Sequence, residues 1–253
     1  MGSSATFELM GLHFDGISHD SLIERILSDL EADRGGWLVN PNLDCLRICV
    51  ADLEVRDLVN RADLVVADGV PLIWAARVRG DAPPDRVAGS SLIRSLAEAA
   101  GARGVGVFLL GGTDDEMDSE AADALREGCP DLRVTWHVPP FGFEADAGAR
   151  QAIDDALDAF GPAVVFCGLG FPKQERLMEE LARVHPSSWF LGSGASISFL
   201  AGRTARAPGW MQDRGLEWVF RLVSEPRRLW RRYIVHDLPF AVRMFMWAAR
   251  TRR

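Results

Sequence analysis

Asp68 is the first candidate for a catalytic side chain. It follows the apolar run 64–67 and precedes Gly69, so its carboxylate lies at the end of a predicted strand, where partial burial suits a carboxylate to act as a general base. The alternative is helix capping, because Asp is a favoured N-cap residue and a helix with Pro71 in its first turn is predicted over 70–76. Taken alone, this motif favours capping over catalysis.

A second candidate group surrounds Lys173, the only lysine of the chain. Lys173 stands with Gln174 and Glu175 at the predicted start of a helix that follows a glycine-containing loop. A cation, an amide and the unpaired N–H groups of a helix start would therefore meet where a diphosphate can bind. The alternative is a surface helix start in which Glu175 only complements the helix dipole.

Arg86 is the third candidate, because it precedes a probable loop into a helix capped by Ser90 or Ser91. A planar guanidinium at that place suits a carboxylate or a phosphate group. The five histidines show no metal-ligand spacing, so we expect no catalytic metal. The chain also lacks the glycine patterns of P-loop and dinucleotide-binding proteins and the G-x-S-x-G motif of serine hydrolases.

The elements that must position these residues alternate between strands and helices. Strands are predicted over 37–40, 64–67, 105–110, 133–137, 163–167 and 188–191, and helices over 114–129 and 146–160. This alternation predicts an α/β fold, a Rossmann-like and mostly parallel sheet with helices on both faces. Ligands of such sheets bind beyond the carboxyl ends of the strands.

The residues at those strand ends are polar or glycine-rich. The segments concerned are 40–44, 67–69, 111–114, 138–142, 168–175 and 192–195. Glycine lets backbone amides approach a ligand closely, and a following helix offers N–H groups to a phosphate. The pattern therefore predicts a nucleotide or another phosphate-containing ligand.

Composition describes an ordinary soluble chain with one unusual segment. The 253 residues are 48% hydrophobic and 25% charged, which excludes disordered and fibrous classes. No apolar run reaches the roughly 18 to 20 residues of a membrane span, and no leader pattern opens the chain, so we expect a cytoplasmic protein. The four cysteines form no C-x-x-C pair and are predicted to be buried thiols in a reducing compartment.

Charge divides the chain unevenly. Residues 203–253 contain twelve arginines and four acidic residues, a net charge of +8, which leaves −16 for residues 1–202 of a chain whose total is −8. The basic segment is also rich in Trp and Phe, the composition of helices that lie in a bilayer interface. The alternatives are a solvated helical face, or helices that pack their aromatic residues on the body. We therefore predict a body, 1–202, and a helical appendage, 203–253.

Taken together, these motifs resemble the WecG/TagA/CpsF family of bacterial glycosyltransferases. The resemblance runs in order along nearly the whole chain. Its blocks are 40–44 (NPNLD), 66–71 (VADGVP), 86–90 (RVAGS), 108–112 (FLLGG), 168–175 (GLGFPKQE), 192–195 (GSGA), 201–202 (AG), 206–208 (RAP), 215–218 (GLEW), 221–222 (RL), 225–228 (EPRR) and 231–233 (RRY).

The resemblance implies an inverting, metal-independent enzyme that moves a sugar from a UDP-sugar to a polyprenyl-diphosphate-linked saccharide in surface polysaccharide assembly. It implies that Asp68 is the base, that Arg86 contacts the sugar and that Gln174 lies near the pyrophosphate. The C-terminal appendage would close over the site, dock on the anionic inner face of the cytoplasmic membrane and bring in arginines. Those arginines are Arg221, Arg228 and Arg231. No cofactor is expected besides the UDP-sugar substrate.

Two positions depart from the family pattern. Many members carry Thr at the position of Asn40 and Asp at the position of Ser198. A hydroxyl can donate or accept a hydrogen bond where a carboxylate only accepts, so donor preference is expected to differ. Asn40, Asn42, Lys173 and Ser198 complete the predicted substrate-binding set.

Two other functions compete with the transferase. One is a non-catalytic, nucleotide-sensing scaffold on the same fold. The other is a nucleic-acid-binding module that uses the basic segment, but the acidic body and the absence of a reader motif count against a nucleic-acid partner. Apolar surface shared by the appendage and the body would also serve a homo-oligomer interface.

Overall fold

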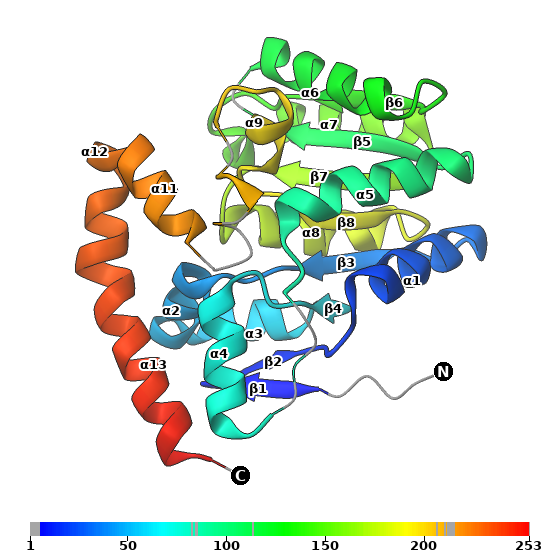
Figure 1. The fold of residues 1–253 in the computed structure, drawn as a ribbon. Helices are drawn as coiled ribbons and strands as arrows, with labels where there is room; N and C mark the ends of the chain where they lie inside the picture. The colour runs from blue at the N-terminus through cyan, green and yellow to red at the C-terminus, as the bar shows by residue number, and fades with distance from the viewer. Residues whose placement is uncertain are drawn as a thin grey trace. The chain divides into compact units, whose positions relative to one another are not determined.

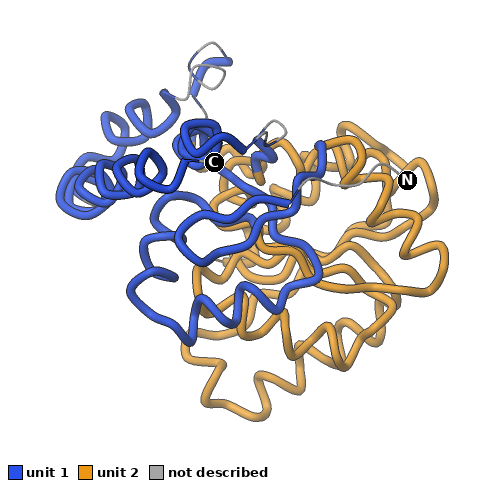
Figure 2. Tube along the Cα trace, turned by 90° about the horizontal axis from the view of Figure 1, so that it is seen from below, with its two compact units in different colours: residues 1–18, 40–88, 205–253 blue, residues 19–39, 89–204 orange. Residues whose placement is uncertain are grey.

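The computed structural model describes residues 6–81, 83, 86–112, 114–205, 207–209, 211 and 216–252, and the side chain of Arg228 lies outside the described part. The chain forms two compact units (Figure 2). The first unit contains Met1–Ser18, Asn40–Ala88 and Ala205–Arg253, and the second contains His19–Val39 and Gly89–Thr204. The basic C-terminal segment thus belongs to the same compact unit as Asn40–Ala88, whereas the sequence predicts a division into 1–202 and 203–253.

The second unit is built on parallel strands, as the apolar runs predict. Its strands are β3 (Gly36–Val39), β5 (Gly106–Gly111), β6 (Val134–His137), β7 (Ala163–Gly168) and β8 (Trp189–Gly192). They lie in the order β3-β8-β7-β5-β6, and Val165 of the central strand is in register with Phe108 on one side and Phe190 on the other. Most of their side chains are buried, which explains why they read as continuous apolar runs in the sequence.

Helices cover both faces of these strands (Figure 1). The helices are α1 (His19–Glu31), α5 (Gly89–Ala102), α6 (Asp115–Gly128), α7 (Ala147–Phe160), α8 (Lys173–Val184) and the short α9 (Ser196–Leu200), with a 3-10 turn η1 (Phe143–Ala145) before α7. α1, α5 and α6 lie on one face, and α7 and α8 lie on the other. The predicted Rossmann-like α/β architecture is therefore confirmed.

The first unit combines a hairpin with short helices. Its elements before the C-terminal segment are β1 (Phe7–Leu9), β2 (Leu12–Phe14), α2 (Leu43–Ala51), α3 (Leu53–Asn60), β4 (Leu64–Val65) and α4 (Val70–Arg79). Phe7 pairs with Phe14 across the antiparallel hairpin, and their rings stack with centroids 5.0 Å apart. The next residue, Asp15, exchanges two hydrogen bonds with Val65: its N–H donates to the Val65 carbonyl at 2.7 Å, and its carboxylate accepts from the Val65 N–H at 2.8 Å.

The C-terminal segment is helical, as predicted. It contains α11 (Glu217–Ser224), α12 (Pro226–Trp230), the π-helical turn η2 (Arg231–Asp237) and α13 (Leu238–Arg250). α13 packs against α4 through a buried row on one of its faces, Phe240, Met244 and Ala248. Arg79 in the last turn of α4 adds a cation–π contact, with its guanidinium 5.3 Å from the centre of the Trp247 ring.

One local prediction was wrong, and one element was not predicted. The helix after Arg86 begins at Gly89, before both Ser90 and Ser91, so neither serine is its cap. The hairpin β1–β2 was not predicted, because three-residue strands are too short to show a period-2 pattern. No helix in the described part of the chain is long and apolar enough to cross a membrane.

Candidate functional site

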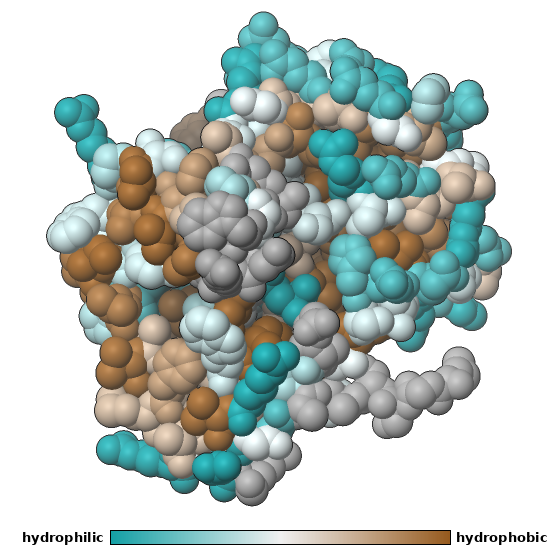
Figure 3. Space-filling model, viewed as in Figure 1, coloured by the Kyte–Doolittle hydropathy of each residue, from teal (hydrophilic) through white to brown (hydrophobic). Residues whose placement is uncertain are grey.

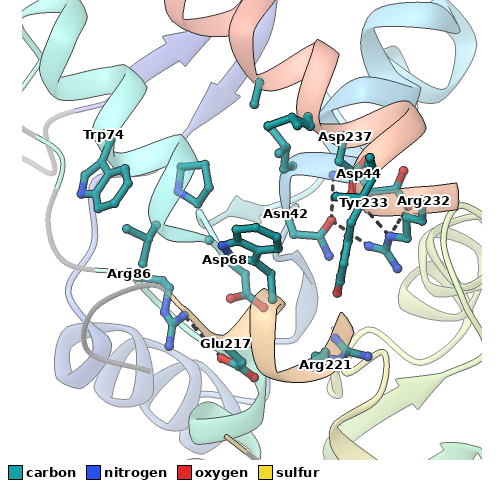
Figure 4. Close-up of a pocket in the computed structure, with 18 of the residues that line it drawn as sticks. Asn42, Asp44, Asp68, Trp74, Arg86, Glu217, Arg221, Arg232, Tyr233 and Asp237 are labelled. Atoms are coloured by element: carbon teal, nitrogen blue, oxygen red, sulfur yellow. Dashed lines mark hydrogen bonds and ion pairs between the residues drawn. The ribbon is translucent and has the colours of Figure 1, made fainter. Parts of the chain in front are cut away.

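A cavity of about 300 Å³ opens in the first unit. Its walls come from the start of α2, the residues around the start of α4, Arg86, and the helices of the C-terminal segment (Figure 4). Its charged and amide lining residues are Asn42, Asp44, Asp68, Arg86, Glu217, Arg221, Arg232 and Asp237. Residues far apart in the sequence thus contribute polar groups to one cavity.

The peptide group between Ala67 and Asp68 forms two backbone hydrogen bonds, one through its N–H and one through its carbonyl. The Asp68 N–H donates to the Pro41 carbonyl at 3.0 Å, and the Ala67 carbonyl accepts from the Val87 N–H at 3.2 Å. The second bond connects the backbone of the Asp68 loop with that of the segment that carries Arg86. The Asp68 side chain is half-buried and points into the cavity (Figure 4).

The capping interpretation of Asp68 was wrong. The N-cap of α4 is Gly69, whose φ of +148° lies in a region that side-chain-bearing residues rarely adopt, and no side chain caps this helix. Gly69, and not Asp68, thus stands at the N-cap position, and Asp68 lines the cavity. The catalytic role of Asp68 stays a prediction.

Arg86 meets a carboxylate from the C-terminal segment. Its Nη1 lies 3.6 Å from Oε2 of Glu217, and each side chain is 19% exposed. Trp218, the next residue of α11, packs edge-to-face on Tyr233 of η2, with ring centroids 6.3 Å apart. The first turn of α11 therefore places the Glu217 carboxylate beside Arg86 and the Trp218 ring in the lining of the cavity.

Asn42 is both a helix cap and a cavity residue. Its Oδ1 accepts from the N–H groups of Asp44 and Cys45 at 3.0 and 3.2 Å, which fixes the start of α2. The same oxygen lies 3.5 Å from Nη2 of Arg232, which donates to it. A side chain predicted to bind substrate is thus held by two structural interactions.

Arg232 belongs to a compact group of opposite charges. Its Nε lies 3.0 Å from Oδ2 of Asp44 and 3.7 Å from Oδ2 of Asp237, and Arg47 completes the group at 3.5 Å from Asp237. Burial, followed by the nearby Asp44 carboxylate, raises the pKa of Asp237 to about 6, although Arg232 and Arg47 oppose this shift. Four charges in close contact therefore join α2 to η2.

The other arginines predicted in the appendage behave differently. Arg221 lines the cavity, whereas Arg231 is exposed and does not line it. The side chain of Arg228 lies outside the described residues. Asn40 is half-buried directly after β3 and is also not a lining residue.

The sequence analysis missed Asp44, Trp74, Glu217, Arg232, Tyr233 and Asp237 as lining residues. Helical spacing offered a partial signal, since positions 234, 238, 241 and 245 share one helix face and all line the cavity. No sequence pattern indicated the pairing of Arg232 with Asn42, which lies 190 residues away.

Three predicted site residues lie in the second unit: Lys173, Gln174 and Ser198. That they belong to the same substrate site as Asp68 stays a prediction. Lys173 forms an ion pair with Glu144 at 2.5 Å and lies 4.7 Å from the centre of the Phe143 ring. The hydrogen bond from Lys173 lowers the pKa of Glu144. This cation is therefore held at the turn before α7.

Gln174 is buried, and both polar atoms of its side-chain amide form hydrogen bonds. Its Oε1 accepts from the Gly170 N–H at 3.1 Å, and its Nε2 donates to Oε1 of Glu175 at 2.9 Å. Burial raises the pKa of Glu175 to about 7, against the opposing hydrogen bond from Gln174. Gln174 thus fixes the glycine loop that follows β7.

Ser198 lies on α9 and contacts α6. Its Oγ is 3.5 Å from the sulfur of Met117. The neighbouring Asp118 is fully buried, and its carboxylate lies against Gly112, where an added Cβ would come within 2.0 Å of Oδ1. Burial raises the pKa of Asp118 to about 7, and the carboxylates of Asp115 and Asp114 add to the shift.

The described residues contain no group of three or more His, Cys, Asp or Glu side chains that could hold a metal ion. None of the four cysteines, all of which the structure describes, forms a disulfide, and Cys49 and Cys167 are buried.

A comparison with known protein families identifies the family of this chain. The model of the Glycosyl transferase WecG/TagA/CpsF family matches residues 7–253, nearly the whole chain. The match includes the Asp68 loop, the glycine loop after β7 and the helical C-terminal segment. The chain therefore belongs to the WecG/TagA/CpsF family of glycosyltransferases, which act in bacterial polysaccharide biosynthesis.

Proposed function

We propose that this glycosyltransferase moves a sugar from a UDP-sugar to a polyprenyl-diphosphate-linked saccharide, with inversion at the anomeric carbon and without a metal ion. The reaction would take place at the inner face of the cytoplasmic membrane. The observation that carries the proposal is the half-buried Asp68, which points into a cavity bordered by Arg86, Arg221 and Arg232. A base and cationic groups in one cavity are what a displacement at an anomeric carbon needs.

In the proposed reaction, Asp68 accepts the proton of the attacking acceptor hydroxyl. The acceptor oxygen forms its bond to the anomeric carbon as the bond from that carbon to the UDP oxygen breaks, and attack from the opposite face inverts the configuration. The proton remains on the Asp68 carboxyl and the electron pair leaves with UDP. The backbone bonds that hold Asp68 keep its carboxylate in place for this step.

The negative charge that develops on the departing diphosphate needs donors that are already in position. Within the first unit, the guanidinium groups of Arg86 and Arg221 line the cavity. In the second unit, Lys173 and Gln174 begin the helix that follows the carboxyl end of β7, the end at which parallel sheets bind ligands. We propose that Lys173 and Gln174 bind the donor diphosphate.

Membrane association is proposed from the surface of the C-terminal segment. Hydrophobic side chains gather over α11 to α13 (Figure 3). Trp218, Val223, Trp230, Val235, Leu238, Val242 and Met246 are exposed there, and Arg227, Arg231, Arg243 and Arg250 are exposed on the same helices. Exposed aromatic and aliphatic side chains interleaved with arginines suit the interface of an anionic bilayer.

Calorimetric titration of the full-length protein with UDP tests the donor, with CMP, GDP and NAD as controls. We expect selective binding of UDP. Asp68→Asn is expected to bind UDP within about threefold of wild type but to lower kcat by at least ~10²-fold, as loss of a general base does. Transfer is expected to persist in EDTA.

Asp57→Asn, a change of an exposed carboxylate on α3 of the same unit, provides the matched control and is expected to retain turnover. Retained turnover in Asp68→Asn would remove Asp68 as the base. Absence of UDP binding, or binding that does not distinguish UDP from GDP and CMP, would contradict the proposed donor.

A further inference from the structure

The cavity of the first unit has two chemically different ends. Asp68, Arg86 and Arg232 border a charged end. Further polar groups of the lining are Asn42, Asp44, Glu217, Arg221 and Asp237, so carboxylates and arginines face the same cavity. Seven apolar lining residues come from the first turns of α4, from η2 and from α13: Val70, Pro71, Trp74, Ile234, Leu238, Ala241 and Phe245. A ligand that fills both ends must carry a charged group and an apolar group.

The apolar character continues out of the cavity along two helices. α4 and α13 both begin at the cavity and pack side by side (Figure 1). Each carries three apolar residues at four-residue spacing, which places them on one face of its helix. We call these six residues the apolar track: Val70, Trp74 and Val78 on α4, and Leu238, Val242 and Met246 on α13.

The apolar track is not what holds the two helices together. The packing face of α13 is the buried row Phe240, Met244 and Ala248, which lies on the other side of the helix. In the track, by contrast, Trp74 is 50% exposed and Leu238 is 54% exposed. Large apolar side chains that stay exposed in a row mark a binding surface.

The shape and charge of this surface indicate a single chain as its occupant. The track starts inside a cavity of about 300 Å³, which admits a slender group but not the face of another protein. At 1.5 Å per residue, each helix row extends about 12 Å, comparable with a short prenyl chain. Arg86 and Arg232 lie at the cavity end of the track, and the exposed Arg77 and Arg243 follow along it, next in sequence to Val78 and Val242.

We infer that the apolar track binds the first part of the hydrocarbon chain of a prenyl diphosphate, whose diphosphate occupies the charged end of the cavity. The inference rests on the proposed lipid-linked acceptor and adds a subsite to it. Trp74 is then a specificity-determining residue for the lipid chain, although it belongs to α4 and not to the C-terminal segment.

The test compares two soluble diphosphates that differ only in the chain. Full-length protein, free of detergent and vesicles, is titrated calorimetrically with farnesyl diphosphate below its micelle concentration and with inorganic pyrophosphate. The measured quantity is the ratio of the two dissociation constants. We expect farnesyl diphosphate to bind at least about tenfold tighter, because part of its chain leaves water.

Trp74→Ser and, independently, Val242→Ser are expected to bring this ratio close to one. Val242 is 53% exposed, so its replacement leaves the core intact if Trp74→Ser fails to fold. The matched control is Leu53→Ser, which removes an equally exposed apolar side chain of the first unit outside the cavity lining. This control is expected to keep the wild-type ratio.

Equal affinities of the wild-type protein for the two diphosphates would overturn the inference. It would also be overturned if the ratio of dissociation constants fell as far in Leu53→Ser as in Trp74→Ser. Failure to bind either diphosphate would overturn it as well. The UDP titration and the transfer assay are independent of these measurements. If the protein binds UDP and turns over but binds the two diphosphates equally, only the lipid subsite is contradicted. If it binds farnesyl diphosphate more tightly than pyrophosphate but does not bind UDP, only the proposed donor is contradicted.

Discussion

Two adjacent arginines of η2 have very different surroundings. Arg232 lies in the cavity and is held by Asn42, Asp44 and Asp237, whereas Arg231 is exposed outside it. A guanidinium that is already fixed by carboxylates loses little conformational freedom when it binds a phosphate with its remaining donors. On this physical ground, Arg232 is the better candidate for the diphosphate contact that the family resemblance implies for Arg231.

Arg232→Gln is therefore expected to lower kcat/KM by about 10²-fold, which corresponds to about 2.7 kcal/mol. Arg231→Gln, which removes the same charge from the next position, is expected to have a much smaller effect. Arg232→Lys restores the charge but not the planar donor geometry and should recover only part of the activity.

The measurements are kcat and KM in a detergent-solubilised transfer assay, with the thermal midpoint of each variant to detect unfolding. If Arg231 is the residue that contacts the diphosphate, the order of the two glutamine variants reverses. A loss in Arg232→Gln that simply follows a lowered thermal midpoint would assign Arg232 a structural role.

Glu175 predicts a pH dependence of stability. Its carboxyl is 1% exposed, and Oε2 has no hydrogen-bond partner among the described residues. Burial raises its pKa from 4.5 to about 7, so the folded protein holds this proton where the unfolded chain releases it. The stability that Glu175 contributes is present at low pH and is lost as pH rises from about 4.5 through about 7.

Glu175→Gln is isosteric and stays neutral, so it should not show this loss. The difference in thermal midpoint, variant minus wild type, is expected to grow in favour of the variant between pH 5 and 7.5 and then to level off. The same substitution at Glu127, which is exposed on α6, serves as the control. A difference that stays flat across this range for Glu175→Gln would contradict the assignment of a raised pKa.

Residue identity predicted part of the site. Asp68, Arg86, Asn42 and Arg221 were all candidates from the sequence and all line the cavity. Glu217 and Arg232 line it as well but were not assigned a role, because their partners, Arg86 and Asn42, are brought to them only by tertiary packing. Spacing along a chain reports neighbours on one element and carries no signal for such pairs.

At the scale of elements, long apolar runs were the reliable signal. All six predicted strands exist within one or two residues of the expected bounds, because buried parallel strands need continuous apolar sequence. Helix starts were less predictable. The sequence favours Asp68 as the cap of the helix that follows it, and it predicts Ser90 or Ser91 as the cap of the helix after Arg86. The N-cap of α4 is instead Gly69, and α5 begins at Gly89, before both serines.

The arrangement of α4 and α13 explains how short elements build a two-ended cavity. Both helices bury one face, with Leu72, Ala75 and Ala76 on α4 and Met244 and Ala248 on α13. Their other faces are then available to line the cavity and to continue beyond it. The π-helical turn η2 precedes α13, and wider turns of this kind often occur at functional sites.

At the scale of the whole molecule, charge separates the C-terminal segment from the rest of the chain. Residues 203–253 carry a net charge of +8, and the remainder carries −16. An acidic body is repelled by an anionic bilayer, whereas a basic segment with exposed apolar side chains is attracted to it. This asymmetry should therefore orient the protein with its C-terminal helices toward the membrane.

Vesicle binding tests this orientation. The full-length protein is expected to cosediment with vesicles that contain phosphatidylglycerol, and less with neutral phosphatidylcholine vesicles or at high salt. Replacing the exposed Arg227, Arg231 and Arg243 together by Gln should weaken binding to the anionic vesicles by about 10²-fold, since each arginine near such a surface contributes about 1 kcal/mol.

A second triple variant separates orientation from net charge. It replaces Arg34, Arg94 and Arg183, exposed arginines of the second unit, by Gln, so it changes the total charge by the same amount. If the C-terminal helices face the bilayer, this variant should bind anionic vesicles nearly as well as the wild type, because it keeps every arginine of the C-terminal segment. Equal losses in the two variants would mean that the total charge of the protein, and not its C-terminal surface, governs attraction to the membrane.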